Sequence, residues 1–115
     1  MQEDPAYQLA QAYLDQGQAL IARGEMAAAV TWLREALRLQ PDLVQARSSL
    51  GLALYGMGDL DGAIDEFRAI LRSQPDMSQA RLNLATALIA KQDWAGARAE
   101  LENVLRTQPN LLQAH

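Results

Sequence analysis

The sequence predicts an all-α protein built from stacked helix pairs, and three observations support that class. Prolines recur at a fixed interval of 34 residues, at Pro41, Pro75 and Pro109, and similar residues surround each of them. Apolar residues between the prolines follow a helical period near 3.6. Glycine and proline interrupt these stripes where helices would end. A period this regular indicates one supersecondary unit, used repeatedly, that buries its apolar face against its neighbours.

The interval divides the chain into units of a single domain that covers residues 1–115. With the proline placed at unit position 32, the three units are residues 10–43, 44–77 and 78–111, and residues 112–115 begin a fourth. The sequence contains no low-complexity segment and no linker between units.

Each unit reads as helix, tight turn, helix, tight turn. In the second unit, apolar residues at helical spacing run over 46–57 and again over 63–71. Between them, Gly58 can take the left-handed conformation that ends a helix, and Asp59 can cap the next helix. Pro75 cannot continue a helix, and Asp76 is expected to offer an N-cap oxygen to the helix that follows.

The other two units repeat this pattern, and the N-terminus adds its own helix start. Asp4 is expected to be an N-cap and Pro5 to occupy the first helical position, where its missing N–H costs nothing. We therefore expect the first helix to begin near Pro5 or Ala6.

Composition excludes several classes of protein. The net charge is −4 and the isoelectric point about 4.8, so the chain lacks the basic surface of nucleic-acid-binding proteins. No apolar run is long enough to cross a membrane. The absence of cysteine excludes disulfides and thiolate sites. Cytoplasmic location is the expectation, with the periplasm as the alternative.

These units resemble the tetratricopeptide repeat, a 34-residue unit with preferred residues at eight positions. In the second unit the matching residues are Leu50, Gly51, Leu54, Ala63, Phe67, Ile70 and Pro75. In the first they are Tyr13, Gly17, Leu20, Ala29, Leu33, Ala36 and Pro41, and in the third Leu84, Ala85, Leu88, Ala97, Leu101, Val104 and Pro109. The resemblance covers residues 10–111 and implies a right-handed α-solenoid of antiparallel helix pairs. An array of 35-residue RNA-reading repeats fits neither the period nor the charge.

A few positions depart from the family pattern. Unit position 4 holds Arg47 and Arg81 where the family prefers a large apolar group, so their alkyl stems are expected to pack while each guanidinium reaches solvent or an acid. Gln92 replaces a turn glycine, and a left-handed conformation there would cost about 1 kcal/mol relative to glycine. Gly17, Gly51 and Ala85 fit a place where two helices approach closely.

The resemblance also implies a concave groove lined by the first helix of each unit. Amides and hydroxyls there can hydrogen-bond the backbone of a partner peptide, and apolar side chains can receive its side chains. The residues predicted to bind a partner are Gln11, Asp15, Gln18, Gln45, Ser48, Ser49, Leu52, Tyr55, Gln79, Leu82, Asn83, Thr86 and Ile89. The groove positions of the family also fall on Leu14, Ile21, Ala22, Gly56 and Ala90.

Other kinds of site find little support. One subfamily binds a partner's C-terminal carboxylate with Lys and Arg, but the corresponding positions here hold no cation. The acidic run 59–66 lacks the spacing of a calcium loop, and a helix dipole explains it. The single histidine, His115, has no catalytic partner. We expect no catalytic residue, no metal and no cofactor.

The last helix of the third unit is expected to leave apolar residues without a covering helix, at Leu101, Val104 and Leu105, which could drive self-association. The preferred function is a non-catalytic scaffold, bacterial by its residue usage, that binds a protein or peptide partner. The alternatives are homo-oligomeric assembly through end-to-end stacking of repeats and an adaptor segment of a larger enzyme.

Overall fold

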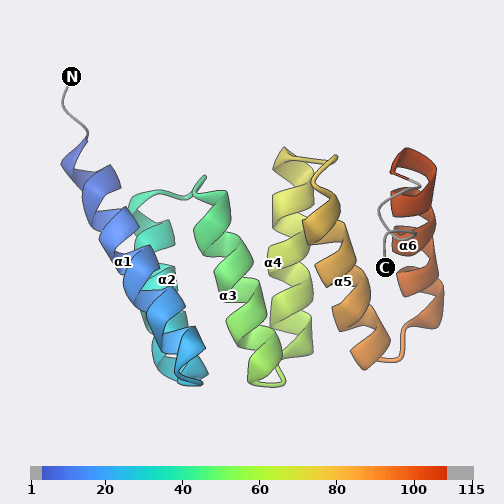
Figure 1. The fold of residues 1–115 in the computed structure, drawn as a ribbon, viewed down its shortest axis with the longest axis horizontal. Helices are drawn as coiled ribbons and strands as arrows, with labels where there is room; N and C mark the ends of the chain where they lie inside the picture. Colours follow the sequence, from blue (N-terminus) through green and yellow to red (C-terminus); the bar gives the residue numbers. More distant parts are fainter. Residues whose placement is uncertain (1–3, 109–115) are drawn as a thin grey trace.

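The structure is a computed structural model that describes residues 4–108, and within them it contains only α-helices (Figure 1). The first pair is α1 (Pro5–Ala22) and α2 (Met26–Leu39), and the second is α3 (Val44–Gly56) and α4 (Leu60–Ser73). The third is α5 (Ser78–Ala90) and α6 (Trp94–Thr107). These three pairs confirm the prediction from the 34-residue interval.

Each helix packs mainly against the helices before and after it in the chain, and α1 also contacts α3. The pairs therefore follow one another along the molecule, from α1 at one end to α6 at the other (Figure 1). A stack of this kind is stabilised by contacts between neighbours in sequence, as in other repeat proteins.

The turn inside each pair uses a left-handed residue, as predicted for the second unit. Gly24 and Gly58 have φ values of 80° and 82°, and Gln92 has φ 68° at the equivalent place. Asp59 then accepts a hydrogen bond from the Gly62 backbone N–H at 3.0 Å, which confirms it as the N-cap of α4. At the N-terminus, Asp4 likewise accepts from the backbone N–H of Ala6, and α1 begins at Pro5.

The turn between pairs differs from the prediction. Asp76 is not an N-cap: the residue before α5 is Met77, and it makes no side-chain capping bond. The reason is geometric. The backbone N–H of Met77 bonds the carbonyl of Gln74 and closes a tight turn around Pro75. The helix therefore starts one residue later than an aspartate cap would require.

The close approach of paired helices is visible at unit position 8. A Cβ on Gly17 would lie 2.6 Å from Leu33 Cγ, and one on Gly51 would lie 2.5 Å from Phe67 Cε1. Leu33 and Phe67 are almost completely buried, so neither can move aside easily. The small residue at position 8 thus makes room for a large residue at position 24 on the second helix.

Candidate partner-binding face

The first helices α1, α3 and α5 carry the residues that the sequence predicted for partner binding, and we call the surface of these residues the first-helix face. Three of its large apolar side chains remain accessible: Leu52 is 45% exposed, Tyr55 38% and Ile89 43%. A single exposed leucine on a protein surface means little. Here, however, the exposed residues fall at unit positions 9 and 12 of neighbouring units, so they belong to one face.

The remaining predicted residues of this face differ in exposure. Asp15, Gln45, Gln79 and Thr86 are exposed, Gln11, Gln18, Ser48, Leu82 and Asn83 are half-buried, and Ser49 is buried. The amide of Gln18 donates to the Ser49 hydroxyl at 3.3 Å and so joins α1 to α3. The amide of Gln79 donates to Asn83 at 3.2 Å along α5. These bonds orient polar groups on the face before any partner binds.

Leu14 corrects the prediction made from unit position 5. Its side chain has no exposed surface and belongs to the hydrophobic core. In the first unit this position therefore stabilises the fold and does not line a groove.

Two side-chain interactions between neighbouring units were not predicted from the sequence. Gln18 and Ser49 are 31 residues apart, and the Lys91 ammonium pairs with Asp61, 30 residues away. Both spacings are close to one repeat interval. A search for polar pairs three or four residues short of the 34-residue interval would have found both pairs.

The arginines at unit position 4 turn away from the first-helix face. Arg47 Nη1 lies 2.8 Å from Glu66 Oε1 on α4, and Nη2 donates to the Pro41 carbonyl at 3.0 Å. Arg81 repeats both contacts, with Glu100 at 2.7 Å and the Pro75 carbonyl at 2.7 Å. The predicted acid partner is confirmed, and the bond to the preceding turn adds a link between units.

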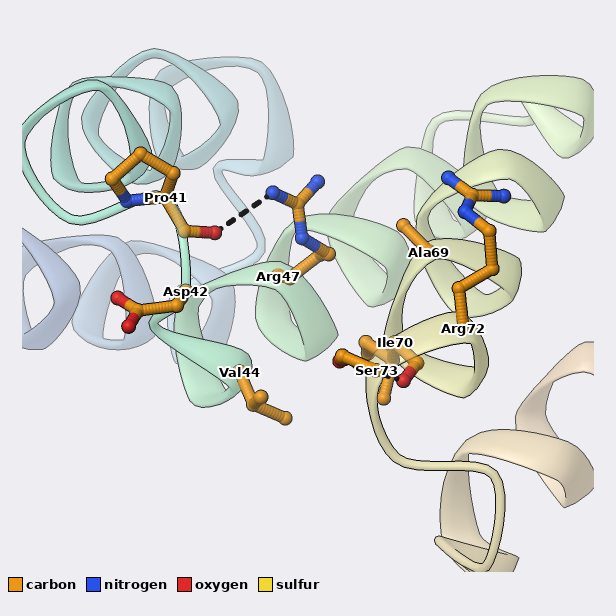
Figure 2. Close-up of a pocket in the computed structure, with 8 residues that line it drawn as sticks. All are labelled: Pro41, Asp42, Val44, Arg47, Ala69, Ile70, Arg72 and Ser73. Carbon is orange, nitrogen blue, oxygen red and sulfur yellow. Dashed lines mark hydrogen bonds between the residues drawn. The ribbon is translucent and has the colours of Figure 1, made fainter.

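A hollow lies beside each of these arginines. The first has a volume of about 370 Å³ and is lined by Pro41, Val44, Arg47, Ile70 and Arg72, among others (Figure 2). The second has the same volume at the equivalent place in the third unit. Figure 2 shows the Arg47 guanidinium directed at the Pro41 carbonyl. The guanidinium groups of Arg47 and Arg81 already have an acid and a carbonyl as partners, and the recurrence of the hollow follows from the repeat.

The predicted self-association residues on α6 do not form one accessible patch. Leu105 is 44% exposed and Leu101 is half-buried, but Val104 is only 1% exposed. Val104 therefore cannot contribute surface to an association. Leu101 occupies the unit position at which Leu33 and Phe67 are fully or almost fully buried, so the side chain at this position is less covered in the third unit.

The second helices carry a different kind of surface. On α2, the Arg38 guanidinium donates to both carboxylate oxygens of Glu35, at distances from 2.8 to 3.2 Å. These hydrogen bonds lower the pKa of the Glu35 carboxyl and raise the pKa of Arg38. This pair is solvent-exposed, so it contributes little to folding.

Residues 4–108 contain no group of three or more acidic, histidine or cysteine side chains placed to hold a metal ion. None of the helices α1 to α6 has both the length and the apolar content that a membrane span requires.

Successive antiparallel helix pairs with one accessible first-helix face define an α-helical repeat solenoid. A family model described as tetratricopeptide repeat matches residues 49–111, and a second, described as TPR repeat, matches residues 17–58. The chain belongs to the tetratricopeptide repeat family. No curated protein sequence matches it.

Solved structures with the same fold include YrrB, described as a TPR protein with an unusual peptide-binding site. It is 23% identical, with a TM-score of 0.84 over 90% of this chain and 53% of that chain. MamA from Desulfovibrio magneticus RS-1 is 25% identical, with a TM-score of 0.81 over 87% of this chain and 56% of its own. The present chain thus spans little more than half the length of these two proteins.

A third similar structure is the first TPR of Spaghetti (RPAP3), solved bound to the HSP90 peptide SRMEEVD. It is 17% identical, with a TM-score of 0.84 over 90% of this chain and 82% of that one. The likeness at this level of identity establishes the shared fold.

Proposed function

We propose that this chain is a non-catalytic protein-binding module that holds a peptide segment or a helix of a partner protein against its first-helix face. The observation that carries the proposal is the accessibility of Leu52, Tyr55 and Ile89 on neighbouring first helices. Large apolar groups that a fold leaves exposed on one face favour contact with another molecule. The same helices also carry amides and hydroxyls, which can satisfy the polar groups of a bound segment.

Similar structures support this use of the fold. YrrB is described by its peptide-binding site, and the Spaghetti domain was solved with a peptide bound. Peptide recognition on a repeat surface needs no active site, only complementary side chains on a rigid support.

The test is affinity capture from a lysate of the source organism with three forms of the chain. The first is the native chain, the second carries Tyr55→Ala and Asn83→Ala, and the third carries Thr31→Ala and Arg68→Ala on the exposed surface of α2 and α4. We expect a partner that the native chain and the third form recover and the second form loses. Helical circular dichroism of all three forms checks that folding is unchanged. Recovery of the same proteins by the second form would refute the assignment of the face.

A further inference from the structure

Charged residues are unevenly distributed between the first and the second helices of the pairs. The first helices α1, α3 and α5 contain three charged residues, Asp15, Arg47 and Arg81. The second helices α2, α4 and α6, which are of nearly equal total length, contain twelve. The chain therefore keeps most of its helical charge away from the face that we propose for binding.

Two of the three charges on the first helices are also removed from that face. The guanidinium groups of Arg47 and Arg81 are directed at Glu66 and Glu100 on the second helices, and their side chains are only 27% and 18% exposed. Asp15 is the one formal charge that the described part of the chain leaves on the first-helix face. It lies at the N-terminal end of the array, and Gln11 approaches it to 3.5 Å.

The uncharged residues of this face form two rows across the three units. Unit position 2 holds a glutamine in all three units: Gln45 and Gln79 lie at the start of α3 and α5, and Gln11 lies two turns into the longer α1. Unit position 12, near the end of the same helices, holds an apolar residue each time. These residues are Tyr55 and Ile89, which belong to the first-helix face, and the equivalent Ile21, which is half-buried and packs against the hydrophobic core. Ten residues of helix separate the two rows by about 15 Å along each helix axis.

We propose that the partner segment is uncharged and amphipathic where it touches this face, and that it lies extended across the three first helices. A glutamine amide both donates and accepts hydrogen bonds, so the glutamine row can bond the free N–H and C=O groups of an extended backbone. The backbone N–H and C=O groups of a helical partner are already bonded within the helix, so an extended segment fits the glutamine row better. Tyr55 and Ile89 receive the apolar side chains of the segment.

The scarcity of charged residues on the first-helix face argues against a charged partner segment. A carboxylate or ammonium group brought against this face would lose hydration without gaining an opposite charge, and that loss is unfavourable. The one exception is a cation opposite Asp15. Binding driven by apolar contact and neutral hydrogen bonds also depends little on salt, since screening acts on charges. This inference rests on the proposed function and adds the chemistry of the partner.

The experiment uses a displayed library of random peptides, selected on the full chain. We expect enriched peptides to contain fewer Lys, Arg, Asp and Glu residues than the starting library. For an enriched synthetic peptide, the Kd is expected to change less than about twofold between about 0.05 and 0.5 M salt. Peptides enriched in charge, or a Kd that weakens about tenfold over that range, would overturn the proposal.

Two variants separate this inference from the proposed function. Tyr55→Ala should weaken an enriched peptide by about tenfold or more, while Thr31→Ala on α2 should leave its Kd unchanged. If Tyr55→Ala has no effect but binding is salt-independent, the location of the site is wrong and the proposed function fails. If Tyr55→Ala weakens binding that is strongly salt-dependent, the face is right and the neutral partner is wrong. Failure to enrich any peptide overturns both.

Discussion

The first helix pair and the second use the same two unit positions for different chemistry. In the first unit, positions 4 and 23 hold Tyr13 and Trp32, whose ring centroids are 5.3 Å apart with the planes tilted by 52°. In the second, they hold Arg47 and Glu66, which form an ion pair. The helix pair thus accepts either an aromatic contact or an ion pair at one geometric site.

The difference follows from what precedes each unit. Arg47 reaches back six residues to the carbonyl of Pro41, in the turn that joins the first unit to the second. Six residues before Tyr13 the chain is at Tyr7, inside α1, where the carbonyl belongs to the helical hydrogen-bond ladder. An arginine in place of Tyr13 would therefore have no turn carbonyl to bind. An aromatic pair needs only its partner ring.

The largest expected effect on stability is at unit position 24, which Leu33 occupies in the first unit and Leu101 in the third. Leu33→Ala should destabilise the chain by about 2–5 kcal/mol, because Leu33 has no exposed surface and its removal leaves a cavity. Leu101→Ala should cost less than about 2 kcal/mol, because Leu101 is half-buried. Urea unfolding of both variants gives the two free energies. Equal costs would mean that burial of the side chain does not explain the difference expected between the two ends.

A smaller effect is expected at positions 4 and 23. Arg47→Met keeps the packed alkyl stem but removes the ion pair and the bond to Pro41, so the expected cost is about 1–3 kcal/mol. A double-mutant cycle with Glu66→Gln should give a coupling that shrinks as salt rises from about 0.05 to 0.5 M.

The matched cycle in the first unit uses Tyr13→Leu and Trp32→Leu. Its coupling should be about 0.5–1.5 kcal/mol and independent of salt, since aromatic contact does not depend on net charge. If the two cycles respond to salt in the same way, the contrast between the units does not hold.

The smallest effect concerns the Glu35 carboxyl on α2, whose side chain is partly exposed. Arg38 lowers its pKa in the folded chain, so its contribution to stability is present above the unfolded pKa and is lost as pH falls through the folded value. The raised pKa of Arg38 plays no part, because that group stays protonated throughout this range. Glu35→Gln should lower Tm slightly at about pH 7, and the difference should shrink as the pH is lowered through the range in which carboxyls titrate. A difference that persists in acid would assign the effect to helix propensity instead.

Much of the fold could be predicted because the repeat supplies three comparisons of each position. The left-handed turn at Gly58 and the close approach at Gly51 follow from residue type and place alone. Even Gln92, which departs from the glycine of other units, takes the left-handed conformation that its position requires. Here the repeat geometry overrides the local preference of the residue.

The predictions that were wrong concern residues whose role depends on three-dimensional packing. Asp76 has the right side chain for a cap, but the turn closed by Met77 moves the helix start beyond it. Leu14 falls at a groove position by number and is nevertheless buried in the core, and Val104 is buried at the predicted association surface. The choice of partner for Arg47 could have been predicted, because the 19-residue interval to Glu66 recurs between Arg81 and Glu100.

The bond from Arg47 to the turn of the preceding unit has a consequence for array length. A second copy of residues 44–77, inserted after Met77, would place its arginine six residues beyond a proline carbonyl and 19 residues before a glutamate. Every copy would therefore carry the arginine that bonds the unit before it and the proline carbonyl that accepts from the unit after it. Lengthening this protein by whole units should need no redesigned junction, and each added unit would extend the first-helix face by one more helix.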